Sequence, residues 1–236
     1  MNWLKSTLAT MIIAAMAACA HTPNFDQSQL KESTAWVAYS QDWETEALEV
    51  YAEATAAARR IGEASKPGSW AVIMDVDETV MNNVQYQIER DLAGLGYTPE
   101  SWYAWTQRED ATLVPGAKAF IEAVNAAGGV VALVTNRADR EQLATENNLA
   151  ALDLERQEDF KILLTRAAGT PSDKNTRFSL VPDMLAVQGF EGATVRIYVG
   201  DGRGDKPNVK GNWQFFCIDQ GAMYGEPCAE TPGTGR

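Results

Sequence analysis

Two aspartates stand at the end of an apolar stretch, in the segment WAVIMDVDETV of residues 70–80. The apolar part has the composition of a buried strand, and Asp75 and Asp77 come at its end. Burying a carboxylate without a partner is costly, or it raises the pKa until the group is neutral. A metal ion, a cationic neighbour or the open edge of a sheet must therefore compensate these two side chains.

Polar groups also occur at the ends of three further apolar stretches. They are Thr135, Asn136 and Arg137 at the end of GVVALVTNR, Lys174 and Arg177 soon after FKILLT, and Asp201 and Asp205 in GDGRGD at the end of TVRIYVG. Oxygen ligands, a lysine and small hydroxyl or amide groups suit a hard divalent cation such as Mg²⁺ with a phosphate beside it. The residue types therefore favour phosphate chemistry, provided that the fold brings the four segments together.

An alternation of strand-like and helix-like stretches predicts how they meet. The strand candidates are residues 70–76, 129–135, 160–165, 194–200 and, more weakly, 212–218; helical stretches occupy residues 115–128 and 137–152. Apolar strands that alternate with helices imply βαβ units, and these predict an α/β fold with a doubly wound parallel sheet. Ligands bind such sheets at the carboxyl ends of the strands, which is where the polar groups lie.

Two segments lie outside this alternation. Residues 30–65 repeat apolar and aromatic side chains at spacings of three and four and end at SKPGS, which predicts one long packed helix. Residues 81–114, after the first strand, are longer than an ordinary connecting loop. We expect them to form a helical insertion that, with the N-terminal helix, makes a small cap over the sheet.

Composition excludes several classes of function. The chain has 236 residues, 45% of them hydrophobic, which fits one domain, and its net charge of −12 argues against a nucleic-acid polymer as partner. The only histidine is His21, near the N-terminus. Phosphohistidine chemistry and a Ser-His-Asp triad are therefore excluded for the folded domain, and a zinc site is disfavoured.

The N-terminus predicts export. Residues 1–19 carry one lysine before an apolar run that is shorter than the ~20 residues of a membrane span, as in a secretory signal peptide. Its last four residues, MAAC, resemble a bacterial lipobox, which would make Cys19 the lipidated first residue; Ala20 after it would direct the protein to the outer membrane. A plain signal peptide, with Cys19 incidental, is the alternative. Residues 20–29 then form a tether, and residues 30–236 form the domain.

Cys217 and Cys228 lie close together near the C-terminus. In an oxidising compartment such a pair can form a disulfide that closes a short loop. A reduced, buried Cys217 beside an exposed Cys228 is the alternative.

The four polar segments together resemble the motifs of the haloacid dehalogenase-like (HAD-like) phosphatases. The matching patterns are D-x-D-E-T, T-N-R, D-K-x-x-R and G-D-x-x-x-D, in that order within residues 70–206. The lipobox, the N-terminal helix, DVDETVMNN, SWYAW followed by VPGA, and VTNR resemble more narrowly the bacterial lipoprotein acid phosphatases. These are the 5′-nucleotidase lipoprotein type of the class B-like acid phosphatase group. The resemblance implies a HAD-like Rossmannoid core and Mg²⁺-dependent hydrolysis of phosphomonoesters, nucleoside monophosphates among them.

The resemblance also implies residue roles. Asp75 is expected to be the nucleophile and Asp77 the general acid and base. Mg²⁺ is expected on Asp75, the backbone carbonyl of Asp77 and Asp201. The expected phosphate contacts are Thr135, Asn136 and Lys174, and the expected supporting residues are Asp205, Thr79 and Arg177. Glu78 is expected to be supporting or simply solvated.

One motif departs from the family. The usual form is close to G-D-N-x-x-D-F, whereas this chain has GDGRGDK, with Gly202 in place of Asn and Lys206 in place of the aromatic. Both acidic positions are kept, so the departure concerns loop geometry and metal affinity. Other interpretations are a helix cap for the two aspartates of the first motif, a surface role for Lys174, and a calcium loop or a coincidental Arg-Gly-Asp tripeptide at the fourth motif.

Aromatic residues suggest where a substrate ring binds. Tyr86 in the insertion and Tyr224 near the C-terminus are candidates to stack on a nucleobase. Trp102 and Trp105 are expected to form the core of the insertion instead. Three hypotheses follow: a nucleotide phosphatase, a phosphatase without preference for a ring, and a degenerate surface lipoprotein that binds a ligand without turnover.

Overall fold

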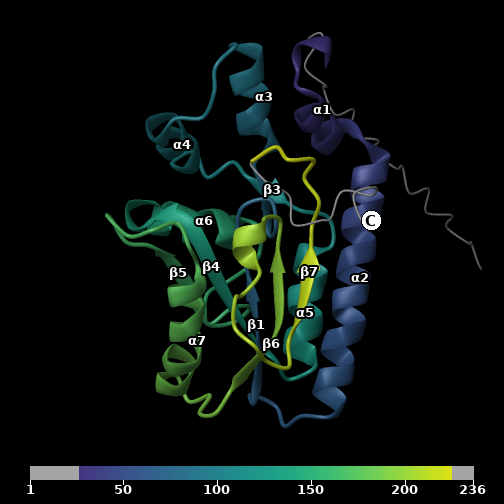
Figure 1. Ribbon diagram of the computed structural model, residues 1–236, viewed down its shortest axis with the longest axis vertical. Coiled ribbons are helices and arrows are strands. Elements are labelled where there is room, and N and C mark those ends of the chain that lie inside the picture. Colours follow the sequence, from purple (N-terminus) through teal and green to yellow (C-terminus); the bar gives the residue numbers. More distant parts are fainter. Residues whose placement is uncertain (1–26, 225–236) are drawn as a thin grey trace, which may run out of the picture.

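The structure, a computed structural model, describes residues 27–224 of the chain (Figure 1). Its centre is a sheet of strands β1 (Trp70–Met74), β4 (Val130–Ala138), β5 (Ile162–Arg166), β6 (Thr194–Gly200) and β7 (Gln214–Cys217). The spatial order is β5-β4-β1-β6-β7, and every neighbouring pair is parallel. The predicted doubly wound parallel sheet is confirmed, including its weaker fifth strand.

Helices cover both faces of this sheet. Trp70, Val72 and Met74 of β1 belong to one core with helices α2 (Gln41–Glu63), α5 (Ala117–Ala126) and α6 (Gln142–Ala151). Ala71 and Ile73 face the opposite core, which contains α7 (Asn175–Val187). All five residues of β1 are buried, because each face of the strand is covered.

The N-terminal segment forms two helices where the sequence predicts one. Helix α1 (Glu32–Tyr39) ends before Ser40, and α2 begins after it. The Ser40 hydroxyl accepts hydrogen bonds from the N–H groups of Asp42, at 3.1 Å, and Trp43, at 3.4 Å. This N-cap competes with a continuous helix, so the chain bends there.

A cap lies over the carboxyl ends of the strands. It consists of α3 (Val84–Leu92), α4 (Pro99–Thr106) and the short antiparallel pair β2 (Met81–Asn82) and β3 (Thr112–Leu113). Helix α1 packs against α3, and Figure 1 shows α1, α3 and α4 together at that end of the molecule. The helical insertion is thus present, and the β2–β3 pair at its base is an addition that the sequence analysis did not predict.

Several predictions concern the chain termini. None of the helices within residues 27–224 is long and apolar enough to cross a membrane. The signal peptide, Cys19 and most of the tether lie outside the described residues, so lipidation stays a prediction. Cys217 is disulfide-bonded, but its predicted partner Cys228 also lies outside the described residues.

Candidate active site

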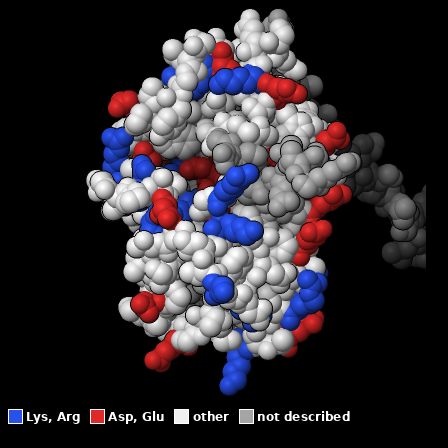
Figure 2. Space-filling model, in the orientation of Figure 1, with Lys and Arg blue, Asp and Glu red and all other residues white. Residues whose placement is uncertain are grey.

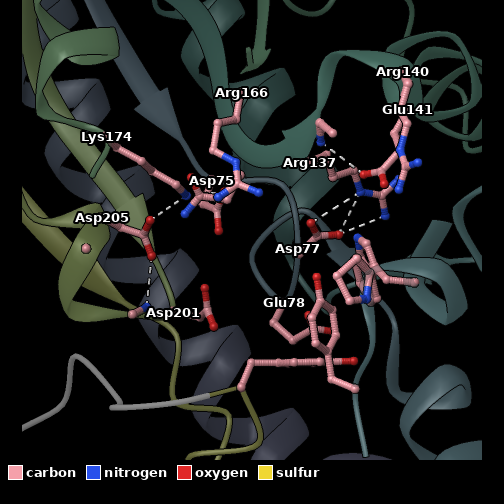
Figure 3. Close-up of a pocket in the computed structure, with 18 residues that line it drawn as sticks. Asp75, Asp77, Glu78, Arg137, Arg140, Glu141, Arg166, Lys174, Asp201 and Asp205 are labelled. Carbon is pink, nitrogen blue, oxygen red and sulfur yellow. Dashed lines mark hydrogen bonds and ion pairs between the residues drawn. The ribbon is translucent and has the colours of Figure 1, made fainter. Parts of the chain in front are cut away.

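The chain turns tightly directly after β1. The Met81 N–H donates to the Val76 carbonyl at 2.8 Å, and the Glu78 N–H donates to the Met81 carbonyl at 2.7 Å. Glu78 adopts a left-handed backbone with φ of 55°. Because of this turn, Asp75 and Asp77 both line one cavity at the sheet edge (Figure 3). The two aspartates therefore do not serve as a helix cap.

This cavity has a volume of about 310 Å³ and lies between the strand ends and the cap. The ends of β1, β4, β5 and β6 contribute charged side chains to it, and the cap contributes Tyr97, Pro99 and Trp102. Figure 2 shows its opening as a hollow with acidic side chains inside and Lys and Arg side chains around it. The four polar segments of the sequence thus meet at one site.

Three carboxylates and a lysine form the floor. One carboxylate oxygen each from Asp75, Asp201 and Asp205 lies within 4.8 Å of the others. Lys174, only 2% exposed, forms ion pairs with Asp75 and with Asp205, the latter at 2.6 Å. Lys174 is therefore not a surface residue, and one lysine cannot balance three buried carboxylates.

The pKa values reflect this excess of negative charge. Burial raises the pKa of Asp75 to about 7, although the positive charge of Lys174 lowers it. Burial and the negative charge of Asp205 raise the pKa of Asp201 well above its usual range. Burial alone would lower the pKa of Lys174, but Asp75 and Asp205 raise it, so the lysine stays charged. Clustered, incompletely neutralised carboxylates fit the donor set of a divalent cation such as Mg²⁺.

The altered GDGRGDK loop holds both acidic residues in the site. A Cβ atom on Gly200 would lie 2.1 Å from the Cβ of Asp205, so only glycine permits this approach. The Gly202 N–H donates to Asp205 at 2.9 Å, and Gln220 donates to Asp201 at 3.0 Å. Asp205 was expected only as a supporting residue behind the metal ligands, whereas its oxygen belongs to the carboxylate cluster itself. Gln220 was not predicted as a site residue, because no spacing in the sequence indicates it.

Asp77 lies on the cavity wall, where it pairs with a cation. Arg137, 2% exposed, donates from Nε and Nη2 to Oδ1 of Asp77 at 2.9 and 2.8 Å. Asn83, fully buried, donates to the same oxygen at 2.9 Å. Arg137 belongs to the T-N-R motif and Asn83 ends the DVDETVMNN segment, but neither residue received a predicted role.

The two phosphate contacts predicted at the end of β4 differ in their access to the cavity. Asn136 is exposed and lines the cavity, but Thr135 is fully buried, does not line it, and accepts the Arg137 N–H at 3.1 Å. Arg177 donates to the Thr135 carbonyl and, at 2.5 Å, to Asn136 Oδ1. Arg177 therefore braces this loop, as expected of a supporting residue.

Two residues of the first motif are more buried than expected. Glu78 is 3% exposed and accepts the Asn83 N–H at 2.7 Å. Of its two expected roles, simple solvation is therefore wrong, and a supporting role remains. Burial raises the pKa of Glu78 well above the usual range. Thr79 is fully buried, and its carbonyl accepts the Tyr51 hydroxyl at 2.6 Å. Thr79 thus supports the turn through its backbone.

The aromatic wall differs from the predicted one. Tyr86 does not line the cavity; it is 2% exposed, pairs with the Ser101 hydroxyl and packs edge-on against Trp102 at 5.1 Å between ring centroids. Trp102 and Tyr224 do line the cavity, and the centroids of their rings are 6.0 Å apart. The Tyr224 hydroxyl has no hydrogen-bond partner within residues 27–224. Trp102 therefore takes the cavity position expected for Tyr86. Trp102 and Trp105 both belong to the hydrophobic core, as predicted.

Comparison with known proteins agrees with this arrangement. The family model of the HAD superfamily, subfamily IIIB (acid phosphatase), matches residues 4–207. The class C acid phosphatase from Bacillus anthracis with tungstate bound has a similar fold, with a TM-score of 0.67 and 20% identity over 82% of this chain and 84% of that one. A second structure of that Bacillus anthracis enzyme gives a TM-score of 0.64 at the same identity and coverage. The chain belongs to the HAD superfamily, subfamily IIIB, the acid phosphatases, and is a phosphomonoesterase.

Proposed function

We propose that the enzyme is Mg²⁺-dependent and hydrolyses nucleoside monophosphates through an aspartyl-phosphate on Asp75. One observation carries the proposal. Asp75 pairs with Lys174 inside the carboxylate cluster, on the floor of a cavity that also has an aromatic wall. A nucleophile, a cation for the phosphoryl group and a surface for a ring are thus present together.

The first half-reaction transfers the phosphoryl group to the enzyme. The substrate phosphate binds beside Lys174 and Asn136, and the Asp75 carboxylate attacks phosphorus while the bond to the leaving oxygen breaks. Asp77 donates its proton to that oxygen, so the product leaves as an alcohol. Mg²⁺, which Asp75, Asp201 and Asp205 would hold, supplies charge neutralisation when bound.

The second half-reaction releases phosphate. Asp77, now a carboxylate, removes a proton from a water molecule as the water oxygen attacks phosphorus. The bond between phosphorus and Asp75 breaks, which restores the carboxylate and frees inorganic phosphate. Lys174 neutralises charge on the phosphoryl oxygens in both steps. A similar class C acid phosphatase was solved with tungstate, an oxyanion, bound to it, which supports an anionic substrate for this enzyme.

The cavity supports an anionic substrate that carries a ring. Arg137, Arg140, Arg166 and Lys174 line it, in a chain whose net charge is −12. Six carboxyl side chains line the same cavity, so these four cations would attract an anion together with the bound Mg²⁺ that offsets the carboxylates. Trp102 supplies an aromatic face at a wall of the same cavity, and a nucleobase is a ring of suitable chemistry.

The N-terminal sequence supports the location that we propose. Residues 1–19 have the pattern of a lipoprotein signal peptide. We place the enzyme at the bacterial outer membrane, anchored by lipid on Cys19, with its domain in the periplasm or at the cell surface. Metabolic labelling with a fatty-acid analogue tests this, because Cys19→Ala should abolish the label.

Release of inorganic phosphate from a nucleoside monophosphate tests the activity. Turnover should require Mg²⁺, stop with a chelator and be lost in Asp75→Asn. Equal rates on a nucleoside monophosphate and a simple sugar phosphate would contradict the nucleotide preference and favour the broad-specificity hypothesis. Full activity in Asp75→Asn would contradict the aspartyl-phosphate. Absence of turnover on every ester by folded protein would favour the degenerate ligand-binding lipoprotein.

A further inference from the structure

A single buried asparagine connects the cap to Asp77. Asn83 lies between β2 and α3 and is fully buried. Its Nδ2 donates to Asp77 Oδ1 at 2.9 Å, while its Oδ1 accepts from Trp105 Nε1 at 2.9 Å and from Arg137 Nη2 at 3.1 Å. Trp105 belongs to α4 of the cap and Arg137 to β4 of the sheet. Asn83 thus contacts both layers and the proposed general acid.

These contacts make the two oxygens of Asp77 unequal. Oδ1 accepts three hydrogen bonds, from Asn83 and from Nε and Nη2 of Arg137, at 2.8 to 2.9 Å. Among the residues that the structure describes, Oδ2 accepts just one hydrogen bond, a longer one from Arg137 Nε at 3.2 Å. An oxygen surrounded by donors cannot also carry a proton toward a substrate. Oδ2 is therefore the oxygen of Asp77 that is left to contact a substrate.

Arg137 is itself held from several sides. Its Nη1 donates to the Thr145 hydroxyl of α6 at 3.1 Å, and its guanidinium carbon lies 5.7 Å from the centroid of the Trp102 ring. Its side chain is only 1% exposed. The guanidinium therefore has little freedom to follow a displaced Asp77. Asn83 is hydrogen-bonded to both Asp77 and Arg137, so it is placed to keep the two side chains aligned.

We propose that Asn83 is a positioning residue that orients Asp77 for proton donation only when Trp105, and with it the cap, is docked. The proposal rests on the proposed role of Asp77 as general acid. It predicts that loss of the Trp105–Asn83 bond impairs protonation of the leaving oxygen, because a small misplacement of a catalytic group can slow a step by about 10²-fold. Phosphate binding on Lys174 is unaffected.

Two full-length variants test the proposal. Asn83→Asp replaces the Nδ2 donor with an acceptor at unchanged size, and Trp105→Phe removes the indole N–H while keeping an aromatic ring. Trp213→Phe is the matched control, since its indole N–H donates to the Val209 carbonyl at 3.0 Å, remote from the active site. The kcat and KM are measured with Mg²⁺ on a nucleoside 5′-monophosphate and on 4-nitrophenyl phosphate, whose leaving group needs little protonation.

We expect kcat on the nucleotide to fall by roughly 10- to 100-fold in both variants, with unchanged KM and a much smaller loss on 4-nitrophenyl phosphate. The control should match the wild type on both esters. Asp77→Asn should give the largest loss of kcat that is selective for the nucleotide, about 10²- to 10⁴-fold. If Asp77→Asn slows both esters equally, the role of Asp77 is wrong and the inference with it. If Asp77→Asn is selective but Trp105→Phe is not, only the positioning role of Asn83 is overturned.

Discussion

Replacing Lys174 with methionine tests whether this lysine is the main counter-charge of the carboxylate cluster. Lys174 is 2% exposed and pairs with Asp75 and Asp205, which are themselves buried. Methionine keeps the length and apolar stem of the side chain but removes the charge. We expect Lys174→Met to unfold much more easily than the wild type in the absence of metal, and to lose phosphatase activity.

The size of the expected stability loss follows from the burial of the ion pairs of Lys174. Removing one partner of a buried ion pair costs about 3–5 kcal/mol, because an uncompensated charge remains. Such a loss is a large part of the ~5–15 kcal/mol that stabilises an ordinary domain. The loss should be smaller with Mg²⁺ present, since a cation bound only to the folded state stabilises it.

The loss of stability in Lys174→Met should also depend on pH. Burial raises the pKa of Asp75 to about 7 in the folded protein, whereas an aspartate in an unfolded chain titrates near ~3.9. A carboxyl group with a raised folded-state pKa costs stability above its unfolded pKa, and the cost grows until the folded pKa is passed. Without Lys174 this pKa rises further, so the variant should be most destabilised at pH 8 and much less at pH 5, where Asp75 is protonated.

Urea unfolding of the metal-free protein at pH 5 and pH 8 measures this effect. Lys118→Met is the matched control, because Lys118 pairs with Asp153 at the surface, where the two side chains are 30% and 89% exposed. Such a pair contributes about 0–1 kcal/mol. An equal loss at both pH values, or a loss no larger than that of the control, would refute the assignment of Lys174.

Three further predictions concern the site. Gly200→Ala should weaken Mg²⁺ binding in a calorimetric titration, because its Cβ would meet the Cβ of Asp205 at 2.1 Å. Gly204→Ala should bind Mg²⁺ nearly normally, because no atom of the described residues lies within 4 Å of its Cβ. Mg²⁺ affinity should fall as the pH is lowered from 8 to 6, since protons compete for Asp75, whose pKa is about 7; a pH-independent affinity would contradict this. Arg166→Gln should raise KM several-fold with a smaller change in kcat, because Arg166 lines the cavity that receives an anion; an unchanged KM would contradict it.

Much of the catalytic floor could be predicted from local sequence. Asp75, Asp201 and Lys174 each follow an apolar strand or lie shortly beyond one, and the carboxyl ends of parallel strands meet at one edge of a sheet. The alternation of apolar strands and helices indicated that sheet, because a strand buried on both faces is apolar throughout. Chemistry and fold class were therefore both present in short-range patterns.

The wall of the site depended on packing between distant segments. Asp77 and Arg137 are 60 positions apart, and their ion pair exists only because the turn after β1 faces the end of β4. The choice of Trp102 over Tyr86 as a cavity residue depends on how α3 and α4 settle on the sheet. Both rings have the same apolar character in sequence, so periodicity cannot tell which one faces the substrate. Local sequence patterns were thus sufficient to locate the buried carboxylates, the lysine that pairs with them and the sheet that presents them. The contacts that hold Asp77 and the rings that line the cavity could not be predicted in this way, because they depend on packing between elements that are distant in sequence.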